Sequence, residues 1–290
     1  MTYRKIIQLS PTTKVVTLPT EWLSKNKVRK GDSVSVEENG NQIIIETTKS
    51  NSDLFYSDLT LLTDDLLWNV VDAFYVLGYS NMQLKVSTSQ KILLNKIVKH
   101  FPMFIIASET KTIIELRAVA DKLNMDFDKT LQHIKHITCN MVDEALILIE
   151  KKDWEGLNKI KKLDYTLNSY ISMCFRQLNS GIIKNAVAWA QYVKIVEVYA
   201  DRLCILFEHI SQLKTVVKSD IDTIKKINEL YTDSFKLLNN FSIKNVNMHD
   251  ANRMSLESSF VKSPLRDNFK ELTRYLFDIQ EIIFQLRQPM

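Results

Sequence analysis

Glycine and proline are scarce in this chain, with five of each in 290 residues. Because both residues interrupt helices and populate turns, their scarcity favours long helices over a loop-rich fold. The sequence contains neither of the glycine-rich phosphate-binding motifs, G-x-G-x-x-G and the P-loop. It also contains no nucleophile elbow and no zinc-type spacing of Cys and His. We therefore expect a protein that is not an enzyme.

Cysteine is also rare, and Cys139, Cys174 and Cys204 lie far apart without any Cys-x-x-Cys spacing. We expect buried, reduced thiols, which are typical of the cytoplasm. No uncharged run approaches the ~20 residues that cross a bilayer. The first residues form no apolar signal-peptide core. These absences predict a cytoplasmic protein that does not insert into a membrane.

The composition is that of an ordinary globular protein, with 45% apolar and 25% charged residues and a net charge of +4. Its length is enough for two or three domains. Residues 1–50 hold eight Lys and Arg against five Asp and Glu, whereas the remaining 240 residues hold 30 against 29. The positive excess therefore falls on the smallest segment, as expected of a nucleic-acid-binding face.

Four short strands and one helical turn are predicted in the first fifty residues. The strands are expected at 4–9, 14–19, 33–36 and 42–46, and the helical turn at 21–25. Thr20 is expected to cap the helix through its hydroxyl, and Asn39-Gly40 favours a hairpin turn because both residues tolerate positive φ. So small a segment cannot bury an adequate core alone. We therefore expect it to pair with a second copy.

The motifs of this segment resemble the AbrB/SpoVT/MazE swapped-hairpin DNA-binding domain. They are Val15-Val16-Thr17-Leu18-Pro19, Glu21-Trp22, Lys30-Gly31-Asp32 and Ile43-Ile44-Ile45. Ser10-Pro11-Thr12-Thr13 is a departure, since the family usually has glycine in this loop. The resemblance implies a homodimer that binds DNA. The candidate DNA-binding residues are Arg4, Lys5, Lys14, Lys25, Lys27, Arg29 and Lys30. A segment that only dimerises is the alternative.

Residues 51–117 are predicted to form a small α+β connecting unit without visible chemistry. We expect a polar linker at 51–53, a helix from Thr63 to Gly78, a strand at 82–86, a helix that Ser89 opens before Pro102, and strands at 103–107 and 112–116.

Residues 118–290 change to a helical period and predict a bundle. The expected helices are 118–150 (with Leu123 on its apolar stripe), Asp153 to Gly181, 184–215, one from Asp220, and one from Pro264. The third is apolar on most of its circumference, which predicts burial at the centre. The polar stretch 239–259 is expected to break or bend the chain.

Carboxylates lie where this bundle should be apolar. Asp164 falls inside the apolar stripe of its helix, and Asn168 is one turn further on. Glu197 and Asp201 share a face of the next helix. A buried carboxylate needs a cation or several hydrogen bonds, and carboxylates facing inward from adjacent helices bind divalent metals. Pairing with Lys or Arg is the alternative. His133 and His136, three residues apart, are expected on a solvated face.

The segments Leu163-Asp164-Tyr165-Thr166-Leu167-Asn168 and Val196-Glu197-Val198-Tyr199-Ala200-Asp201 resemble the acidic motifs of the PhoU phosphate regulators. The resemblance covers residues 118–288 and implies a metal site, with iron or another divalent metal, on Asp164, Asn168, Glu197 and Asp201. Asn168 stands where the family has Asp, and Val198 and Ala200 replace its usual Arg and Gly. In a second repeat Asp278 persists, but Arg274 occupies the place of an acid.

The three segments together resemble archaeal PhoU-family regulators. The expected fold is α+β multidomain: a swapped-hairpin dimer domain (1–50), the α+β unit (51–117) and a PhoU-like helical bundle (118–290). The resemblance implies a homodimeric, DNA-binding regulator of phosphate uptake. The alternative is an adaptor that binds a phosphate transporter or sensor without binding DNA. A metal-storage bundle is a third reading.

Overall fold

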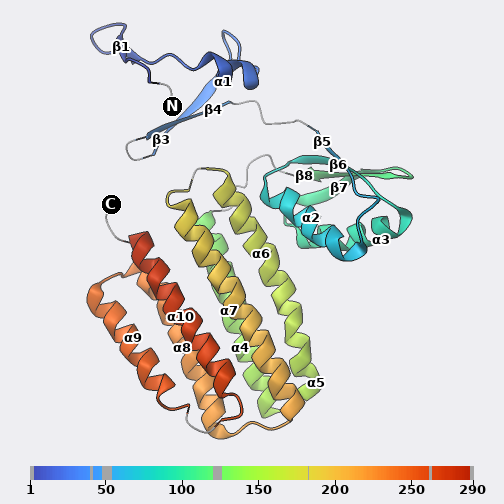
Figure 1. Cartoon of the computed structure of the whole chain (residues 1–290), viewed down its shortest axis with the longest axis vertical. Helices are drawn as coiled ribbons and strands as arrows, with labels where there is room; N and C mark the ends of the chain where they lie inside the picture. Colours follow the sequence, from blue (N-terminus) through green and yellow to red (C-terminus); the bar gives the residue numbers. More distant parts are fainter. Residues whose placement is uncertain are drawn as a thin grey trace. The chain divides into compact units, whose positions relative to one another are not determined.

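The computed structural model of the chain describes residues 3–39, 42–47, 54–119, 126–181, 183–260 and 263–287. The chain divides into two units, residues 1–52 and residues 53–290. Figure 1 shows their elements in chain order. The second unit holds two hydrophobic cores, one in a sheet with its helices and one in a helical bundle.

The first unit consists of two hairpins separated by a short helix, as predicted. Strands β1 (Ile7–Gln8) and β2 (Lys14–Val15) pair antiparallel, α1 spans Thr20–Lys25, and β3 (Val34–Asn39) pairs antiparallel with β4 (Gln42–Thr47). The first hairpin is shorter than predicted. The expected cap was wrong: Thr20 lies inside α1, Pro19 is the N-cap residue, and no side chain caps the helix.

No described side chain of this first unit is buried within one copy. Instead, apolar side chains along both hairpins are largely exposed to solvent. They are Tyr3, Ile6, Ile7, Leu9, Val16, Val36 and Ile43. Burial of apolar surface is the main favourable term in folding. In a single copy the strands of the first unit therefore pair with one another but do not enclose a hydrophobic core.

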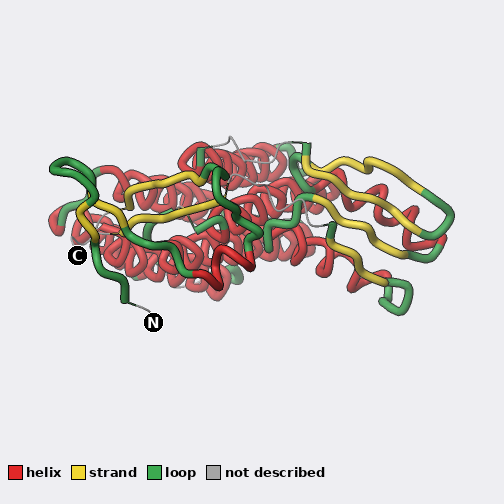
Figure 2. The backbone as a smooth tube through the Cα atoms, turned by 90° about the horizontal axis from the view of Figure 1, so that it is seen from above, coloured by secondary structure: helices red, strands yellow, loops and turns green. Residues whose placement is uncertain are grey.

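The α+β unit is a four-stranded sheet with two helices. Its elements are β5 (Phe55–Asp58), α2 (Asp64–Val76), β6 (Asn81–Lys85), α3 (Thr88–Ile97), the 3-10 turn η1 (Val98–His100), β7 (Phe104–Glu109) and β8 (Ile113–Ala118). The strand order is β5-β6-β8-β7, with β5 parallel to β6 and the other pairs antiparallel. Figure 2 shows the strands side by side. Strand β5 was missed, because the sequence predicts a polar linker followed directly by α2.

Turn chemistry fixes the helix ends of this unit. Gly78 ends α2 as predicted, with a φ of 91° that favours glycine. The predicted start of α3 was two residues late. Ser87 is the N-cap and forms a capping box with Gln90, so Ser89 lies inside the helix. Ile92, expected on the apolar stripe, is 62% exposed.

Within the described residues, the bundle comprises six long helices and two short ones. They are α4 (Phe127–Glu150), α5 (Trp154–Leu157), the 3-10 turn η2 (Asn158–Ile160), α6 (Lys161–Asn179), α7 (Ala186–Leu213), α8 (Lys218–Asn239), α9 (Ile243–Glu257) and α10 (Arg266–Arg287). As predicted, α7 is central: it packs against α4, α5, α6 and α10. Among the described helices, none is long and apolar enough to span a membrane.

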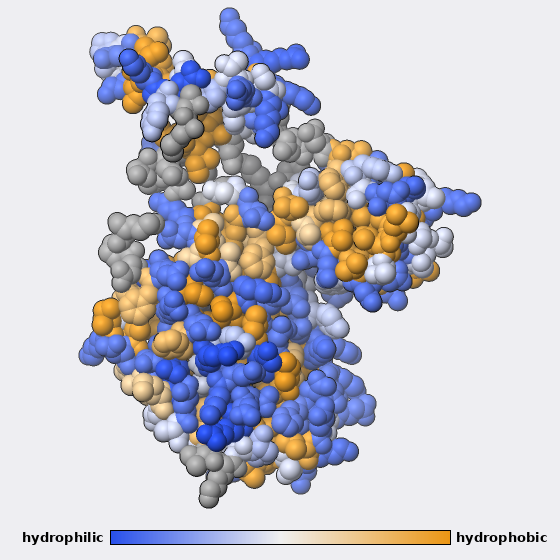
Figure 3. Space-filling model, viewed as in Figure 1, coloured by the Kyte–Doolittle hydropathy of each residue, from blue (hydrophilic) through white to orange (hydrophobic). Residues whose placement is uncertain are grey.

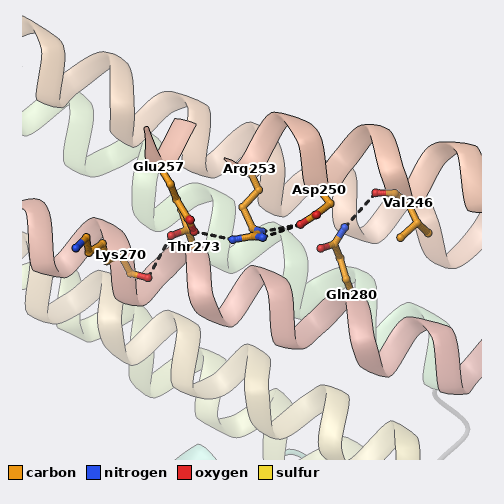
Figure 4. Close-up of polar contacts among 7 residues, drawn as sticks. All are labelled: Val246, Asp250, Arg253, Glu257, Lys270, Thr273 and Gln280. Carbon is orange, nitrogen blue, oxygen red and sulfur yellow. Dashed lines mark hydrogen bonds and ion pairs between the residues drawn. The ribbon is translucent and has the colours of Figure 1, made fainter. Parts of the chain in front are cut away.

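Residues 243–257 form helix α9, so the predicted break at 239–259 was wrong for most of that stretch. Ser242 caps the helix, and Val246, His249 and Leu256 are buried along it. Arg253 reaches Asp250 and Glu257 at 2.7 Å on the same helix (Figure 4). Across from them, Gln280 of α10 donates to the Val246 carbonyl at 3.3 Å. Because these polar side chains form ion pairs or hydrogen bonds within the bundle, a largely polar sequence still forms a packed helix.

Two other helix boundaries differ from prediction. Helix α4 begins at Phe127 with Asp126 as its cap, and Leu123 lies outside the described residues. Asp153 is a cap as predicted, accepting from the Gly156 amide at 2.8 Å. It caps only the four-residue α5, however, and the long helix α6 begins at Lys161.

Arg176 of α6 joins the bundle to the α+β unit. Its guanidinium donates to the carbonyls of Tyr75, Gly78 and Tyr79 at the end of α2, at 2.5–3.2 Å. It also lies over the Tyr75 ring, 5.0 Å from the centroid. Helix C-termini expose unpaired carbonyls and carry partial negative charge, so a cation there is stabilising. Arg176 therefore completes α2 from another part of the chain.

Candidate DNA-binding surface and acidic cleft

The seven predicted DNA-binding residues all belong to the first hairpin and the region of α1. Arg4 and Lys5 precede β1, Lys14 opens β2 and Lys25 ends α1; Lys27, Arg29 and Lys30 follow. All seven side chains are exposed. Long basic side chains on an exposed surface are suited to contact phosphates.

Tight turns position the last three of these residues. The Asn26 side chain donates to the Trp22 carbonyl at 2.9 Å and Lys27 has a φ of 52°, which turns the chain at the end of α1. The Asp32 amide then donates to the Arg29 carbonyl at 3.0 Å, with Gly31 at a φ of 93°. The Asp32 carboxylate accepts from the Arg29 amide at 2.9 Å. Lys30 therefore lies within a hydrogen-bonded turn rather than a loose loop.

Charge is separated along the first unit more sharply than the net value of residues 1–50 indicates. Residues 3–30 carry seven basic side chains and one acidic one, whereas residues 31–47 carry four acidic side chains and no basic one. The two groups correspond to β1, β2 and α1 on one side and to the β3–β4 hairpin on the other. The sequence analysis missed this division because it averaged charge over fifty residues. The first hairpin and α1 together form the basic part.

Asp164 is the most buried of the predicted metal-site residues, at 7% exposed. Its Oδ2 accepts from the Asn168 side chain at 3.2 Å, while Oδ1 is buried without a hydrogen-bond partner among the described residues. Burial, and then the nearby charges of Asp201 and Glu197, raise the pKa of Asp164 to about 6. Asp164 is therefore a carboxylate that lacks a compensating partner.

Glu197 and Asp201 differ from each other in their surroundings. Glu197 accepts from Lys194 at 2.8 Å, one turn earlier on α7. Asp201 has a raised pKa because of partial burial. The pairing with a basic residue that the sequence left open therefore occurs at Glu197. Among the residues that the structure describes, no three His, Cys, Asp or Glu side chains are grouped to hold a metal ion. The metal site stays a prediction.

A cleft of about 520 Å³ opens beside these residues, between α7 and the segment from α5 to α6. Asp164 and Asp201 line it, together with Glu208 and four residues that the sequence analysis did not single out as ligands: Lys161, Arg202, Cys204 and Gln212. Burial raises the pKa of the Cys204 thiol to about 12. Cys204 is therefore a neutral thiol rather than a reactive thiolate.

The remaining candidates lie apart from the cleft. The side chains of His133 and His136 are exposed, as predicted, and His133 stacks on Tyr170 with centroids 5.1 Å apart. Arg274 is exposed, and partial burial raises the pKa of Asp278. The three cysteines are free, as predicted, but only Cys174 is buried, and Cys139 and Cys204 are half-buried.

Comparison with known proteins identifies the first unit alone. Residues 12–53 match the family model of the MazE antitoxin, described as antidote-toxin recognition. Neither the curated proteins nor the solved structures yielded a match to the chain. Domains of the MazE/AbrB type typically bind DNA and dimerise. The match supports the predicted swapped-hairpin domain, because residues 12–53 are similar to this family of domains.

Proposed function

We propose that the protein is a homodimeric, DNA-binding regulator. The observation that carries this proposal is the basic part of the first unit, which overlaps residues 12–53, the segment similar to a domain type that typically binds DNA. Seven exposed cations and one acid over residues 3–30 suit a polyanionic ligand. The acidic β3–β4 hairpin would keep the remainder of the unit away from phosphates, which orients the domain on DNA.

Dimerisation is supported by the exposed apolar strands of the first unit. A second copy would cover the side chains of Ile6, Val36 and Ile43, which one copy leaves largely in water. Dimerisation would also double the number of cations that face DNA. Phosphate contacts from both copies would act together, because a two-fold protein meets two half-sites.

The DNA-binding test is a gel shift with the upstream region of the protein's own gene, at 50 mM and 200 mM salt. Arg4→Ala/Lys14→Ala is expected to weaken binding about tenfold or more and to make the salt dependence shallower. Lys226→Ala, an exposed change on α8, is the matched control and should bind like the unaltered protein. Equal, salt-insensitive binding by all three proteins would contradict the proposal.

The regulated process is proposed to be phosphate homeostasis, acting in the cytoplasm without catalysis. This finer assignment rests on the resemblance of residues 118–288 to the PhoU regulators. A bundle with carboxylates on adjacent helices is compatible with it. In this proposal the bundle senses a signal or docks a partner, and iron or another divalent metal at Asp164, Asn168, Glu197 and Asp201 remains a candidate signal.

The second candidate is an adaptor that uses the first unit only to dimerise, while the bundle binds a phosphate transporter or sensor subunit. Exposed hydrophobic side chains on the second unit favour this adaptor role. Figure 3 shows hydrophobic side chains at the surface of the α+β unit, where Leu61 is 97% exposed and Leu66 and Leu77 are also exposed. Under this reading Arg4→Ala/Lys14→Ala leaves regulation of phosphate uptake unchanged. A regulatory defect in that variant, with the dimer intact, would exclude the adaptor.

A further inference from the structure

The acidic cleft has the size and shape of a site for a small elongated molecule. Its volume of about 520 Å³ lies in the range of ligand pockets. One wall follows α7 through Val198, Asp201, Ile205, Glu208 and Gln212, a stripe at helical spacing. The other wall comes from the segment from α5 to α6, and includes Asp164. The cleft therefore runs along α7.

More acidic than basic side chains line this cleft. Three carboxylates line it, and the two cations are Lys161 and Arg202. Arg202 is engaged by Glu271 of α10 at 3.3 Å, so its charge is already compensated. Asp164, Asp201, Glu208 and Lys161 all line the cleft together with Cys204, and all four act electrostatically on its thiol. This excess of negative charge favours a cationic ligand.

Asp164 supplies an independent indication of a ligand. The residue is more than nine-tenths buried, lines the cleft, and leaves Oδ1 without a partner among the described residues. A buried polar atom without a partner costs free energy that a matching donor would recover. Lys161 acts on Asp164 only as a nearby charge. Oδ1 is itself buried from solvent, so an ammonium group in the cleft would supply the missing donor once the Asp164 carboxyl turns toward it.

The spacing of the carboxylates favours two separated charges over one ion. Asp201 and Glu208 are seven residues apart on α7, which is two turns and about 10 Å along the helix. No three potential ligands meet at one point among the described residues. Ile205 lies between Asp201 and Glu208 on α7, and Leu157 and Ile160 also line the cleft. The cleft therefore offers apolar surface beside two separated carboxylates.

We infer that this cleft binds a linear aliphatic polyamine. One terminal ammonium donates to Asp164 and Asp201, the other pairs with Glu208, and the methylenes between them lie on Ile205 and the apolar wall. The inference does not depend on DNA binding, and it puts an ammonium in place of the metal that the proposed function names as a candidate signal at Asp164 and Asp201. It gives the bundle a ligand of its own.

Isothermal titration of the nucleic-acid-free, full-length protein with spermidine tests the inference. Spermidine is expected to bind at one site per chain. 1,8-Diaminooctane, whose extended chain can reach across two helical turns, is expected to bind more tightly than 1,3-diaminopropane, which is too short to do so. Asp201→Asn and Glu208→Gln should each weaken spermidine binding three- to tenfold. Asp222→Asn, an exposed change on α8, should leave it unchanged.

Three outcomes would overturn the inference. Absence of spermidine binding is one. Equal affinity for both diamines, or equal weakening by Asp222→Asn, would indicate non-specific attraction to negative charge. Displacement of spermidine by micromolar Mg²⁺ or Mn²⁺, with metal binding lost in Asp201→Asn, would identify a metal site instead. Thermal melts of each variant separate loss of binding from loss of fold.

Discussion

The two units of the chain differ in how much of their apolar side-chain surface is buried within one copy. Residues 3–47 bury no described side chain in one copy, whereas the second unit buries residues of every long helix of the bundle and of the α+β sheet in two hydrophobic cores. Both contain ample apolar residues. The difference is therefore one of size and topology: two hairpins and a helical turn cannot enclose their own apolar side chains, and six helices can.

This contrast indicates that folding is coupled to assembly in the first unit and not in the second. The second unit has the interior that independent folding requires, while the first needs a covering surface from outside itself. The same segment carries the cations proposed to contact DNA. In this account DNA binding depends on dimer formation, and the second unit remains folded whether or not the first is paired.

The strongest expected effect is that of Ile43→Lys in β4. Ile43 is 66% exposed in one copy but lies on the surface that a second copy would cover, so a charge there would be desolvated in the dimer. We expect the dimer to weaken by about a thousandfold, or ~4 kcal/mol, by sedimentation velocity. The helical content and the melting of the second unit should stay unchanged.

Leu61→Lys is the matched control, because Leu61 is almost fully exposed in the second unit. Dimer affinity should change by less than about 0.5 kcal/mol. If both variants weakened the dimer equally, the interface would not lie on the first unit.

An intermediate effect is expected for Arg176→Ala, which tests the second unit alone. The change leaves the carbonyls of Tyr75, Gly78 and Tyr79 without their charged donor, and should lower the free energy of unfolding by about 2 kcal/mol in urea. Arg287→Ala, at the exposed end of α10, is the control. An unchanged urea midpoint for Arg176→Ala would show that α2 does not depend on the bundle.

The smallest effect is expected for Asp72→Asn, also between α2 and α6. Burial raises the pKa of Asp72, although a hydrogen bond from Ser172 opposes this. A carboxyl whose pKa is higher in the folded state keeps its proton longer than in the unfolded chain. Its contribution to stability is therefore present at low pH and is lost as pH rises through the raised pKa.

Asp72→Asn should accordingly be more stable than the unaltered protein at pH 7, by about 0.5 kcal/mol. The difference should shrink on acidification toward pH 4. Urea unfolding at both pH values measures it, and an advantage that grew on acidification would reverse the assigned sign.

Periodicity and turn chemistry predicted most of the fold, because these signals are local. The two hairpins, the end of α2 at Gly78 and the buried α7 followed from residue type and spacing. Strand β5 was missed because its four residues, Phe55–Asp58, are identified by pairing with β6, a partner 27 residues away. Helix α9 was missed because its polar side chains find partners within the fold: Arg253 pairs with Asp250, and His249 Nε2 contacts the Leu230 carbonyl.

The candidate sites were also predictable in part, because exposure and burial of their side chains follow from local sequence patterns. Exposure of the seven cations follows from a small surface domain, and burial of Asp164 follows from its place on an apolar stripe. The partners were not predictable. Lys194 binds Glu197 from the same helix, and Arg202 and Lys161 line the cleft because of how α6 and α7 meet. Side-chain direction at an interface between helices depends on packing that sequence spacing does not determine.

Hydrogen exchange of residues 3–47, measured across a dilution series of the full-length protein, shows whether the first unit needs a second copy to fold. We expect amides of β1 to β4 to lose protection as dilution shifts the population to single copies, while the core of the bundle stays protected at every concentration. Protection of β1 to β4 that persists unchanged in the single copy would contradict this expectation.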